Sequence, residues 1–164
     1  MKYWLAAVCL MLLGLDVFSK QWAAQHLPLI HWQEGYPFNG IGVFQLGGVS
    51  FSLNFVTNTG AAWGLFANQA GWLFVVRLGV ILGLMFFLTL FNKGKIPAFP
   101  MWLILTGAFG NALDYALYGH VIDFFHFTFW GSSFPVFNFA DSYITLGAIS
   151  LFFLTRARRT AAAG

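Results

Sequence analysis

Residues 70–91 read AGWLFVVRLGVILGLMFFLTLF, an apolar run of membrane-spanning length that holds a single charge, Arg77. A helix needs about 20 such residues to cross the hydrocarbon core of a bilayer. Similar runs cover about residues 3–22, 96–113 and 136–154. Only helices or closed barrels satisfy their backbone hydrogen bonds in lipid, and the sequence lacks the many alternating segments of a barrel. The pattern therefore predicts four transmembrane helices.

The composition agrees with a membrane protein. Hydrophobic residues make up 59% of the 164 positions and charged residues only 8%, whereas a soluble domain carries about 25% charged residues. So few charges do not cover a water-facing surface. The single cysteine, Cys9, excludes an intramolecular disulfide. We expect membrane lipids and no nucleic acid as partners, and nothing in the sequence demands more than a monomer.

Positive charges gather on one side of the predicted spans. An even number of crossings brings together six of the eight Lys and Arg residues, namely Lys2, Lys93, Lys95, Arg156, Arg158 and Arg159. The positive-inside rule places this side, and both termini, in the cytoplasm. An alternative interpretation makes the first run a cleaved signal peptide. Against it, the run ends in Asp16 and Lys20 and shows no clean small-residue cleavage site.

The outer loops, about residues 23–69 and 116–135, hold nearly all of the chain outside the membrane. In residues 49–55, VSFSLNF, apolar and polar residues alternate as they do in a half-buried strand. Residues 120–130 are rich in Phe and β-branched residues and predict another strand, while residues 61–68 suggest a short interfacial helix. The predicted fold class is an all-α integral membrane protein, with four transmembrane helices and a small extracytoplasmic β-sheet.

Acidic residues give the main chemical signal. Four of the five acids lie in or beside predicted spans: Asp16, Asp114, Asp123 and Asp141. An ionisable group at that depth is costly and marks a functional site by default, although an Asp in the headgroup layer can also simply cap a helix. If the segment between Asp123 and Asp141 folds back, both carboxylates reach the outer membrane surface. Held close together they share one proton, which provides a base to activate water and an acid for the leaving amine.

Three asparagines accompany the acids: Asn58, Asn111 and Asn138. A buried amide is expensive unless it is hydrogen-bonded, so these side chains are candidates for orienting the carboxylates or holding a substrate backbone. Asn138 lies three residues before Asp141, one helical turn away. Taken alone, Asn138 is also well placed to cap the fourth helix.

The chain resembles the bacterial lipoprotein signal peptidases, also called signal peptidase II, in four blocks that follow the family's order. Residues 58–64, NTGAAWG, are similar to the motif N-x-G-A-A-x-G. Residues 110–114, GNALD, with 119–124, GHVIDF, resemble the block G-N-x-x-D-R and G-x-V-x-D-F. Residues 137–142, FNFADS, resemble F-N-x-A-D-S, and residues 16–20, DVFSK, look like the D-x-x-x-K at the end of the family's first helix.

This resemblance implies an aspartic endopeptidase, a hydrolase of lipoprotein processing that cleaves diacylglyceryl-modified prolipoproteins just before the lipidated cysteine. It implies a multi-pass protein of the bacterial cytoplasmic (inner) membrane with its active site near the outer face, a single membrane-embedded peptidase domain over residues 1–164, and an outer β-cradle that holds the substrate. The catalytic pair would be Asp123 and Asp141. Substrate binding and polar support would come from Asp16, Lys20, Asn58, Gly60, Asn111, Asp114 and Asn138.

The sequence departs from the family at one position. The family usually has Arg after the Asp that corresponds to Asp114, and this chain has Tyr115. Arg77 is one candidate to replace that cation, but we favour a snorkelling role for Arg77 near the start of its helix. We expect Tyr115 to leave activity intact because neither residue of the catalytic pair changes.

Other chemistries are less well supported. The four histidines, at positions 26, 31, 120 and 126, show no H-x-x-x-H spacing, so we expect neither a metal nor another cofactor. Serine catalysis lacks a G-x-S-x-G elbow. A proton-coupled transporter would also use intramembrane acids, but it often shows an inverted repeat, which is not visible here. A non-catalytic assembly protein gives no reason for two acids within reach of each other.

Overall fold

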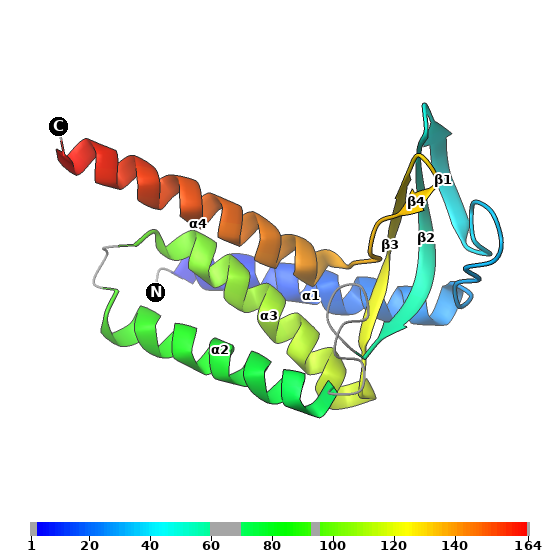
Figure 1. Ribbon diagram of the computed structural model, residues 1–164. Coiled ribbons are helices and arrows are strands. Elements are labelled where there is room, and N and C mark those ends of the chain that lie inside the picture. Colours follow the sequence, from blue (N-terminus) through cyan, green and yellow to red (C-terminus); the bar gives the residue numbers. More distant parts are fainter. Residues whose placement is uncertain (1–2, 60–69, 93–95, 164) are drawn as a thin grey trace.

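The computed structural model describes residues 3–59, 70–92 and 96–163, and this part of the chain forms four helices and one small sheet. The helices are α1 (Tyr3–His26), α2 (Ala70–Leu90), α3 (Ala98–Tyr118) and α4 (Phe139–Ala163). They run side by side, and the sheet projects from one end of the bundle (Figure 1). The predicted helices are confirmed with shifted ends. The proposed interfacial helix at 61–68 and Gly60 lie outside the described residues.

Local chemistry explains where α3 ends. The helix continues five residues beyond its predicted end at residue 113 and stops at Tyr118. Gly119 follows in the left-handed conformation, with φ 74°, and its N–H donates to the Tyr115 carbonyl at 2.9 Å. A residue without Cβ adopts this conformation without strain, so the glycine ends the helix and turns the chain into the next strand.

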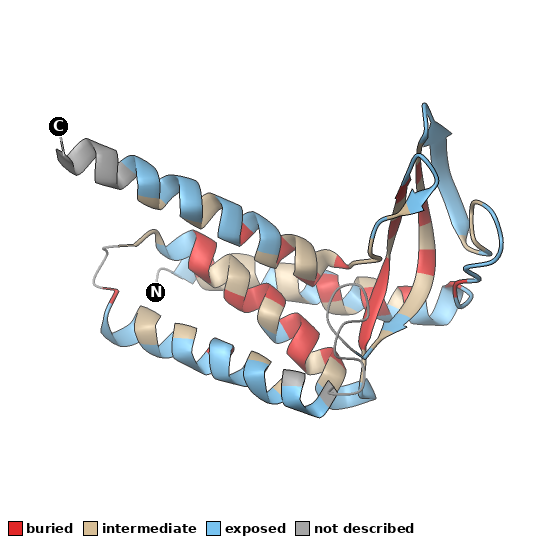
Figure 2. Ribbon diagram, in the orientation of Figure 1, coloured by how far each residue is buried: buried red, intermediate tan, exposed pale blue. Residues whose placement is uncertain are grey.

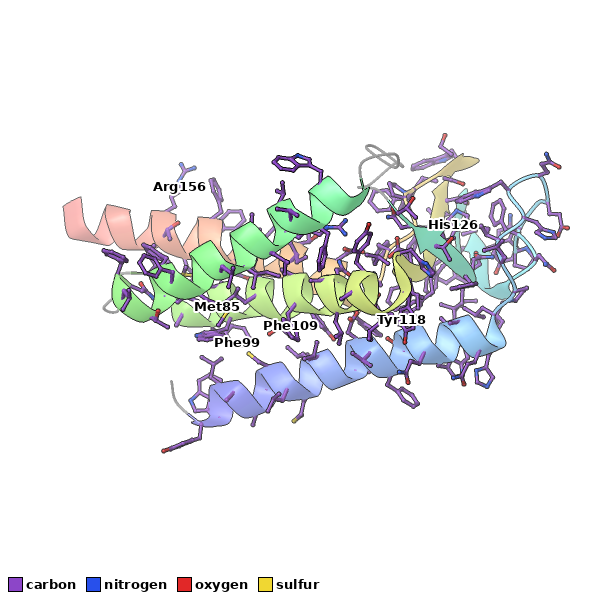
Figure 3. All side chains as sticks on the ribbon, turned by 90° about the horizontal axis from the view of Figure 1, so that it is seen from below. Met85, Phe99, Phe109, Tyr118, His126 and Arg156 are labelled. Atoms are coloured by element: carbon purple, nitrogen blue, oxygen red, sulfur yellow. The ribbon has the colours of Figure 1, made fainter. Side chains whose placement is uncertain are left out.

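Membrane crossing by all four helices is not confirmed. Within the described ranges, α1 alone has both the length and the hydropathy of a membrane span, and the apolar stretch Phe74–Leu90 of α2 is shorter. Exposed residues nevertheless follow the outer sides of the helices (Figure 2), and many of them are large and apolar. Figure 3 shows this along α2 and α3, where Met85, Phe99, Phe109 and Tyr118 are all exposed.

The sheet is antiparallel, in the order β1–β2–β3–β4. Its strands are β1 (Ile41–Leu46), β2 (Val49–Asn58), β3 (Val121–Phe129) and β4 (Ser132–Ser133). The strands predicted at 49–55 and 120–130 are therefore confirmed as β2 and β3. The register of their pairing shifts between Leu53 and Val56, just before the end that enters the bundle.

The two faces of the sheet differ sharply. One face is polar and buried, formed by Ser50, Ser52, Asn54, His126 and Thr128. The segment after α1 covers this face, because the Asn54 amide donates to the Pro37 carbonyl at 2.8 Å and the Phe38 ring packs on His126. The other face is aromatic and includes Phe51, Phe125 and Phe127, which are half-buried.

The sheet is fixed to the bundle through apolar packing at the end of α1. Ala23, Leu27 and Phe124 form a buried cluster against which Leu53 and Phe55 of β2 also pack. Buried residues concentrate on α3 and β3 where sheet and bundle meet (Figure 2). This junction is therefore the most enclosed part of the described chain, and the polar residues buried there need partners.

Candidate active site

The carboxylates of Asp123 and Asp141 line one cavity of about 640 Å³. Asp123 lies on β3 and Asp141 in the first turn of α4, so the cavity sits where the sheet joins the bundle. Asn58 of β2 and Asn111 of α3 also line it. Apolar side chains complete the wall, among them Val121, Phe134, Phe137, Ile144 and Leu146.

Asp141 is held by the start of its own helix. Its N–H donates to Asn138 Oδ1 at 3.0 Å, and its Oδ2 accepts the Asn138 N–H at 3.2 Å. This reciprocal pair is a capping box, in which the residue before the helix and the third helical residue satisfy each other. Oδ1 of Asp141 accepts a further bond from the Asn111 amide at 2.8 Å. Both carboxylate oxygens of Asp141 are therefore fixed, and the first turn of a helix favours a negative charge there.

Asp123 is held by two amides. Its Oδ2 accepts a bond from Asn58 Nδ2 at 3.0 Å, and its Oδ1 accepts one from Asn138 Nδ2 at 2.7 Å. Only 2% of Asp123 is exposed. Burial, together with the nearby charge of Asp141, raises the pKa of Asp123 to about 7, although the two amide bonds and Lys20 oppose the shift. Asp123 is thus able to keep a proton at neutral pH.

Asn138 joins the two acids. It caps α4 through Oδ1 while its Nδ2 contacts Asp123, and it is completely buried. The same Nδ2 lies within bonding distance of the Ile122 carbonyl at 3.1 Å and of Asn111 Oδ1 at 3.2 Å. Capping and orientation of the carboxylates, which were alternatives in the sequence, are both performed by this one side chain.

A second polar cluster lies behind the cavity. The Lys20 ammonium contacts Asp16 Oδ2 at 2.8 Å, Asp114 Oδ2 at 3.0 Å and Asn111 Oδ1 at 2.9 Å. Lys20, Asp16 and Asp114 are buried and do not line the cavity. These three residues are therefore placed to support the site rather than to touch a substrate.

The nine predicted site residues thus fall into three groups. Four of them line the cavity, namely Asn58, Asn111, Asp123 and Asp141. Four stand behind it and contact those residues or the backbone beside them, namely Asp16, Lys20, Asp114 and Asn138. Gly60 lies outside the described residues.

Arg77 lines the cavity together with Asp141, a position that the sequence does not predict. Its expected snorkelling stays a prediction. One turn earlier on α2, the Phe74 ring stacks on Tyr115 with the ring centroids 5.0 Å apart. Tyr115, at the position where the family usually has Arg, thus packs against α2. The same helix contributes Arg77 to the cavity wall.

Two glycines of α3 were not recognised in the sequence as part of the site. A Cβ placed on Gly107 would collide with the Ala140 carbonyl oxygen, and one on Gly110 would lie 2.5 Å from Asp16 Oδ2. The spacing of these glycines on one face of α3 was the available signal, because small residues allow helices to approach closely.

Among the described residues, no histidine lines the cavity of Asp123 and Asp141. His126 is completely buried on the polar face of the sheet, where its Nε2 contacts Ser133 Oγ at 3.1 Å. His26 and His31 are exposed. Within residues 3–59, 70–92 and 96–163, no three His, Cys, Asp or Glu side chains gather as metal ligands.

Comparisons with known proteins agree on one family of peptidases. A family model described as signal peptidase (SPase) II matches residues 8–156. A lipoprotein signal peptidase of Chlamydia pneumoniae is 44% identical over 108 residues, which cover 64% of this chain and 64% of that protein. One of Burkholderia vietnamiensis (strain G4 / LMG 22486) is 40% identical over 116 residues, which cover 67% of this chain and 70% of the relative. The matched region thus spans just under two thirds of the Chlamydia protein's length.

Solved structures support the fold. A bacterial membrane enzyme solved by the in meso method superimposes with a TM-score of 0.78, covering 100% of this chain and 93% of that one at 23% identity. A second bacterial membrane enzyme gives a TM-score of 0.71 at 24% identity, covering 94% of this chain and 92% of its own. At such identities the similarity concerns the arrangement of helices and sheet.

Proposed function

The chain belongs to the signal peptidase II family, and from that premise we propose that it is a membrane-embedded aspartic endopeptidase acting on prolipoproteins. It removes the signal peptide from diacylglyceryl-modified precursors by cutting before the lipidated cysteine. The family assignment does not favour a proton-coupled transporter. One observation carries the proposal: Asp123 and Asp141 line the same cavity and are both bonded to Asn138.

The surroundings of the two acids suggest a division of roles. Asp141 sits at the positive end of α4 and accepts bonds from the Asn111 amide and the Asn138 backbone, so it is the charged base. Asp123 is deeply buried and keeps its proton because its pKa is raised to about 7. The pair shares one proton and titrates as a unit.

The reaction follows from these roles. Asp141 takes a proton from water while the water oxygen bonds to the carbonyl carbon of the scissile peptide, and the proton of Asp123 passes to the carbonyl oxygen. In the second step the carbonyl re-forms and returns its proton to Asp123. The C–N bond breaks as the proton held by Asp141 moves to the leaving nitrogen, and the dyad is restored to its starting state.

The cavity wall suits a substrate that carries lipid. Phe134, Phe137, Ile144 and Leu146 line the cavity beside the dyad. The Phe137 ring continues this wall into the aromatic face of the sheet, with ring centroids 5.6 Å from Phe125 and 6.1 Å from Phe127. Apolar surface of this kind accepts acyl chains or apolar side chains while the polar groups of the site engage the peptide.

The proposal also covers how the protein lies in the membrane. The helices span the bilayer as one peptidase domain, because exposed apolar side chains such as Val75, Leu82 and Phe86 gain by facing lipid. Arg156 lies on α4 at the end opposite the sheet (Figure 3). The positive-inside rule puts that end in the cytoplasm and the dyad near the outer face.

Cleavage of a defined peptide tests the proposal. The purified protein is expected to cut a diacylglyceryl-modified precursor peptide and to leave the unmodified peptide intact. Asp123→Asn and Asp141→Asn each remove an ionisable oxygen with little change of shape, so each is expected to lower kcat at least about 100-fold. Glu34→Gln is the matched control, since Glu34 is exposed and pairs with His31 far from the cavity.

Thermal unfolding of each variant in detergent shows whether it is folded. Folded Asp123→Asn or Asp141→Asn protein that still cleaves the lipidated peptide at the parental rate would rule out the dyad. Equal cleavage of both peptides would rule out recognition of the lipid.

A further inference from the structure

Lys20 places its ammonium group against three side-chain oxygens. It is buried, with 1% of its side chain exposed, and it contacts Asp16, Asp114 and Asn111 at 2.8, 3.0 and 2.9 Å. A lysine ammonium has three donors and no acceptor. The three contacts therefore fix its orientation and tie three side chains of α1 and α3 to one point.

Each acid in this cluster also holds the backbone beside one member of the dyad. Asp16 Oδ1 accepts the N–H of Ala140 at 2.8 Å, and Ala140 directly precedes Asp141. Asp114 Oδ2 accepts the N–H of Ile122 at 3.2 Å, and Ile122 directly precedes Asp123. The cluster is thus hydrogen-bonded to the backbone of both β3 and α4, in each case at the residue that precedes the dyad aspartate.

The third contact of Lys20 reaches the dyad through a side chain. Asn111 Oδ1 faces the ammonium, so the Asn111 amide nitrogen must point the other way. It donates to Asp141 Oδ1 at 2.8 Å. The side-chain amide of an asparagine has an oxygen that accepts and a nitrogen that donates. The contact of Lys20 with Oδ1 therefore favours the orientation in which Nδ2 faces Asp141.

We propose that Lys20 is a positioning residue for the proposed catalytic pair: with Asp16 and Asp114 it clamps β3 and α4 at the spacing at which the two carboxylates share a proton, and it orients Asn111 toward Asp141. The inference rests on the proposed function and adds to it a residue that touches neither substrate nor dyad. Gly110 leaves room for the clamp, because a Cβ there would lie 2.5 Å from Asp16 Oδ2.

A purely structural role for Lys20 makes a different prediction. Replacing a buried ion cluster by apolar groups is often neutral for stability, and breaking it lowers the amount of folded protein without changing how the remaining folded enzyme works. A clamp, in contrast, changes the chemistry of the folded enzyme. Displacing reacting groups by about 1 Å can lower a rate about 100-fold.

The experiment compares Lys20→Met with the parent in detergent on the lipidated peptide. We expect kcat to fall at least about 100-fold per folded molecule while KM stays within about threefold, because Lys20 does not line the cavity. Ser19→Ala is the matched control on the same helix, because its hydroxyl donates to the backbone carbonyl of Asp16 at 2.9 Å and, within the described part of the chain, to no other group. Lys20→Arg is not expected to restore kcat, because a planar guanidinium does not reproduce three ammonium contacts.

A readout without substrate separates this inference from the proposed function. Carbon-13 NMR of the aspartate carboxyls follows the titration of Asp123 and Asp141 directly. In Lys20→Met the two apparent pKa values of the pair are expected to move closer together, as they do when two carboxylates separate. Should Lys20→Met not fold, Asp114→Asn replaces it, since it keeps the shape and removes one charged contact.

The outcomes are distinct. A loss of kcat confined to folded Lys20→Met, with a smaller gap between the two apparent pKa values of the pair, supports the clamp. Parental kcat per folded molecule, or an unchanged gap between the two pKa values, would overturn it. A parent that titrates as a coupled pair and cleaves no lipidated peptide would overturn the proposed function and leave the clamp to be judged by NMR.

Discussion

Comparison of Asn138→Ala with Asn138→Ser separates the two roles of the side chain that bonds to both acids. The alanine substitution removes the cap of α4, in which Oδ1 accepts the N–H of Asp141 at 3.0 Å. It also removes the amide that donates to Asp123 at 2.7 Å and lies 3.1 Å from the Ile122 carbonyl. Asn138→Ser is the matched variant, because a serine oxygen still caps a helix and the amide is gone.

The magnitude follows from these contacts. Loss of the cap is worth about 1 kcal/mol, and leaving a buried acceptor without its donor is worth about 1–3 kcal/mol more. We therefore expect Asn138→Ala to lower the free energy of unfolding by about 2–4 kcal/mol, and Asn138→Ser to recover about 1 kcal/mol of it. Activity should not recover in the same way, since both variants leave Asp123 without the amide.

Two measurements check this reasoning. Unfolding in mixed detergent micelles gives the free energies, and cleavage of the lipidated peptide gives kcat per folded molecule. Both variants are expected to lose at least about tenfold in kcat, with Asn138→Ser the more stable of the two. The reasoning is refuted if Asn138→Ser regains parental kcat together with its stability, because capping alone would then explain the residue.

Three further predictions concern pH and packing. In the proposed mechanism Asp123 is the acid, and it is protonated below its pKa of about 7, so kcat should fall about tenfold per pH unit above that pH. A flat profile up to about pH 9 would contradict the assignment. Burial lowers the pKa of His126, so at acidic pH the unfolded chain binds a proton that the folded protein does not. The melting temperature should therefore drop between about pH 7.5 and about pH 5 in the parent and in His120→Gln, but not in His126→Gln. Gly107→Ala forces a Cβ onto the Ala140 carbonyl and should destabilise the protein by about 1–3 kcal/mol. Gly79→Ala meets nothing within 4 Å and should be neutral or stabilising, as thermal unfolding will show.

The sequence predicted the elements with clear periodicity. Alternation in residues 49–55 identified β2, and long apolar runs identified the helices. It did not identify β1, because a glycine such as Gly42 within Ile41–Leu46 is more typical of a turn or bulge than of a strand. In the structure the pairing register shifts between Gly42 and Phe44, and every residue of β1 is exposed, so burial leaves no alternation to detect.

For the site, the sequence supplied the residue types and the structure supplied their partners. Spacing along the chain placed Asn138 one turn before Asp141, which is a local relation. The bond between Asp16 and Ala140 joins residues 124 positions apart, and no periodicity encodes such a contact. The sequence does not predict the place of Arg77 in the cavity wall for the same reason, since that place depends on how α2 packs on α3.

That long-range bond between Asp16 and Ala140 has a consequence for biosynthesis. A nascent chain inserted as far as β3 already contains Asp123 and the whole lysine cluster, but it has neither the second acid nor the amide that joins the pair. In the proposed mechanism, hydrolysis therefore has to wait until α4 docks against the first helix. Until then the growing polypeptide would leave the proposed lipid-anchored precursors uncut.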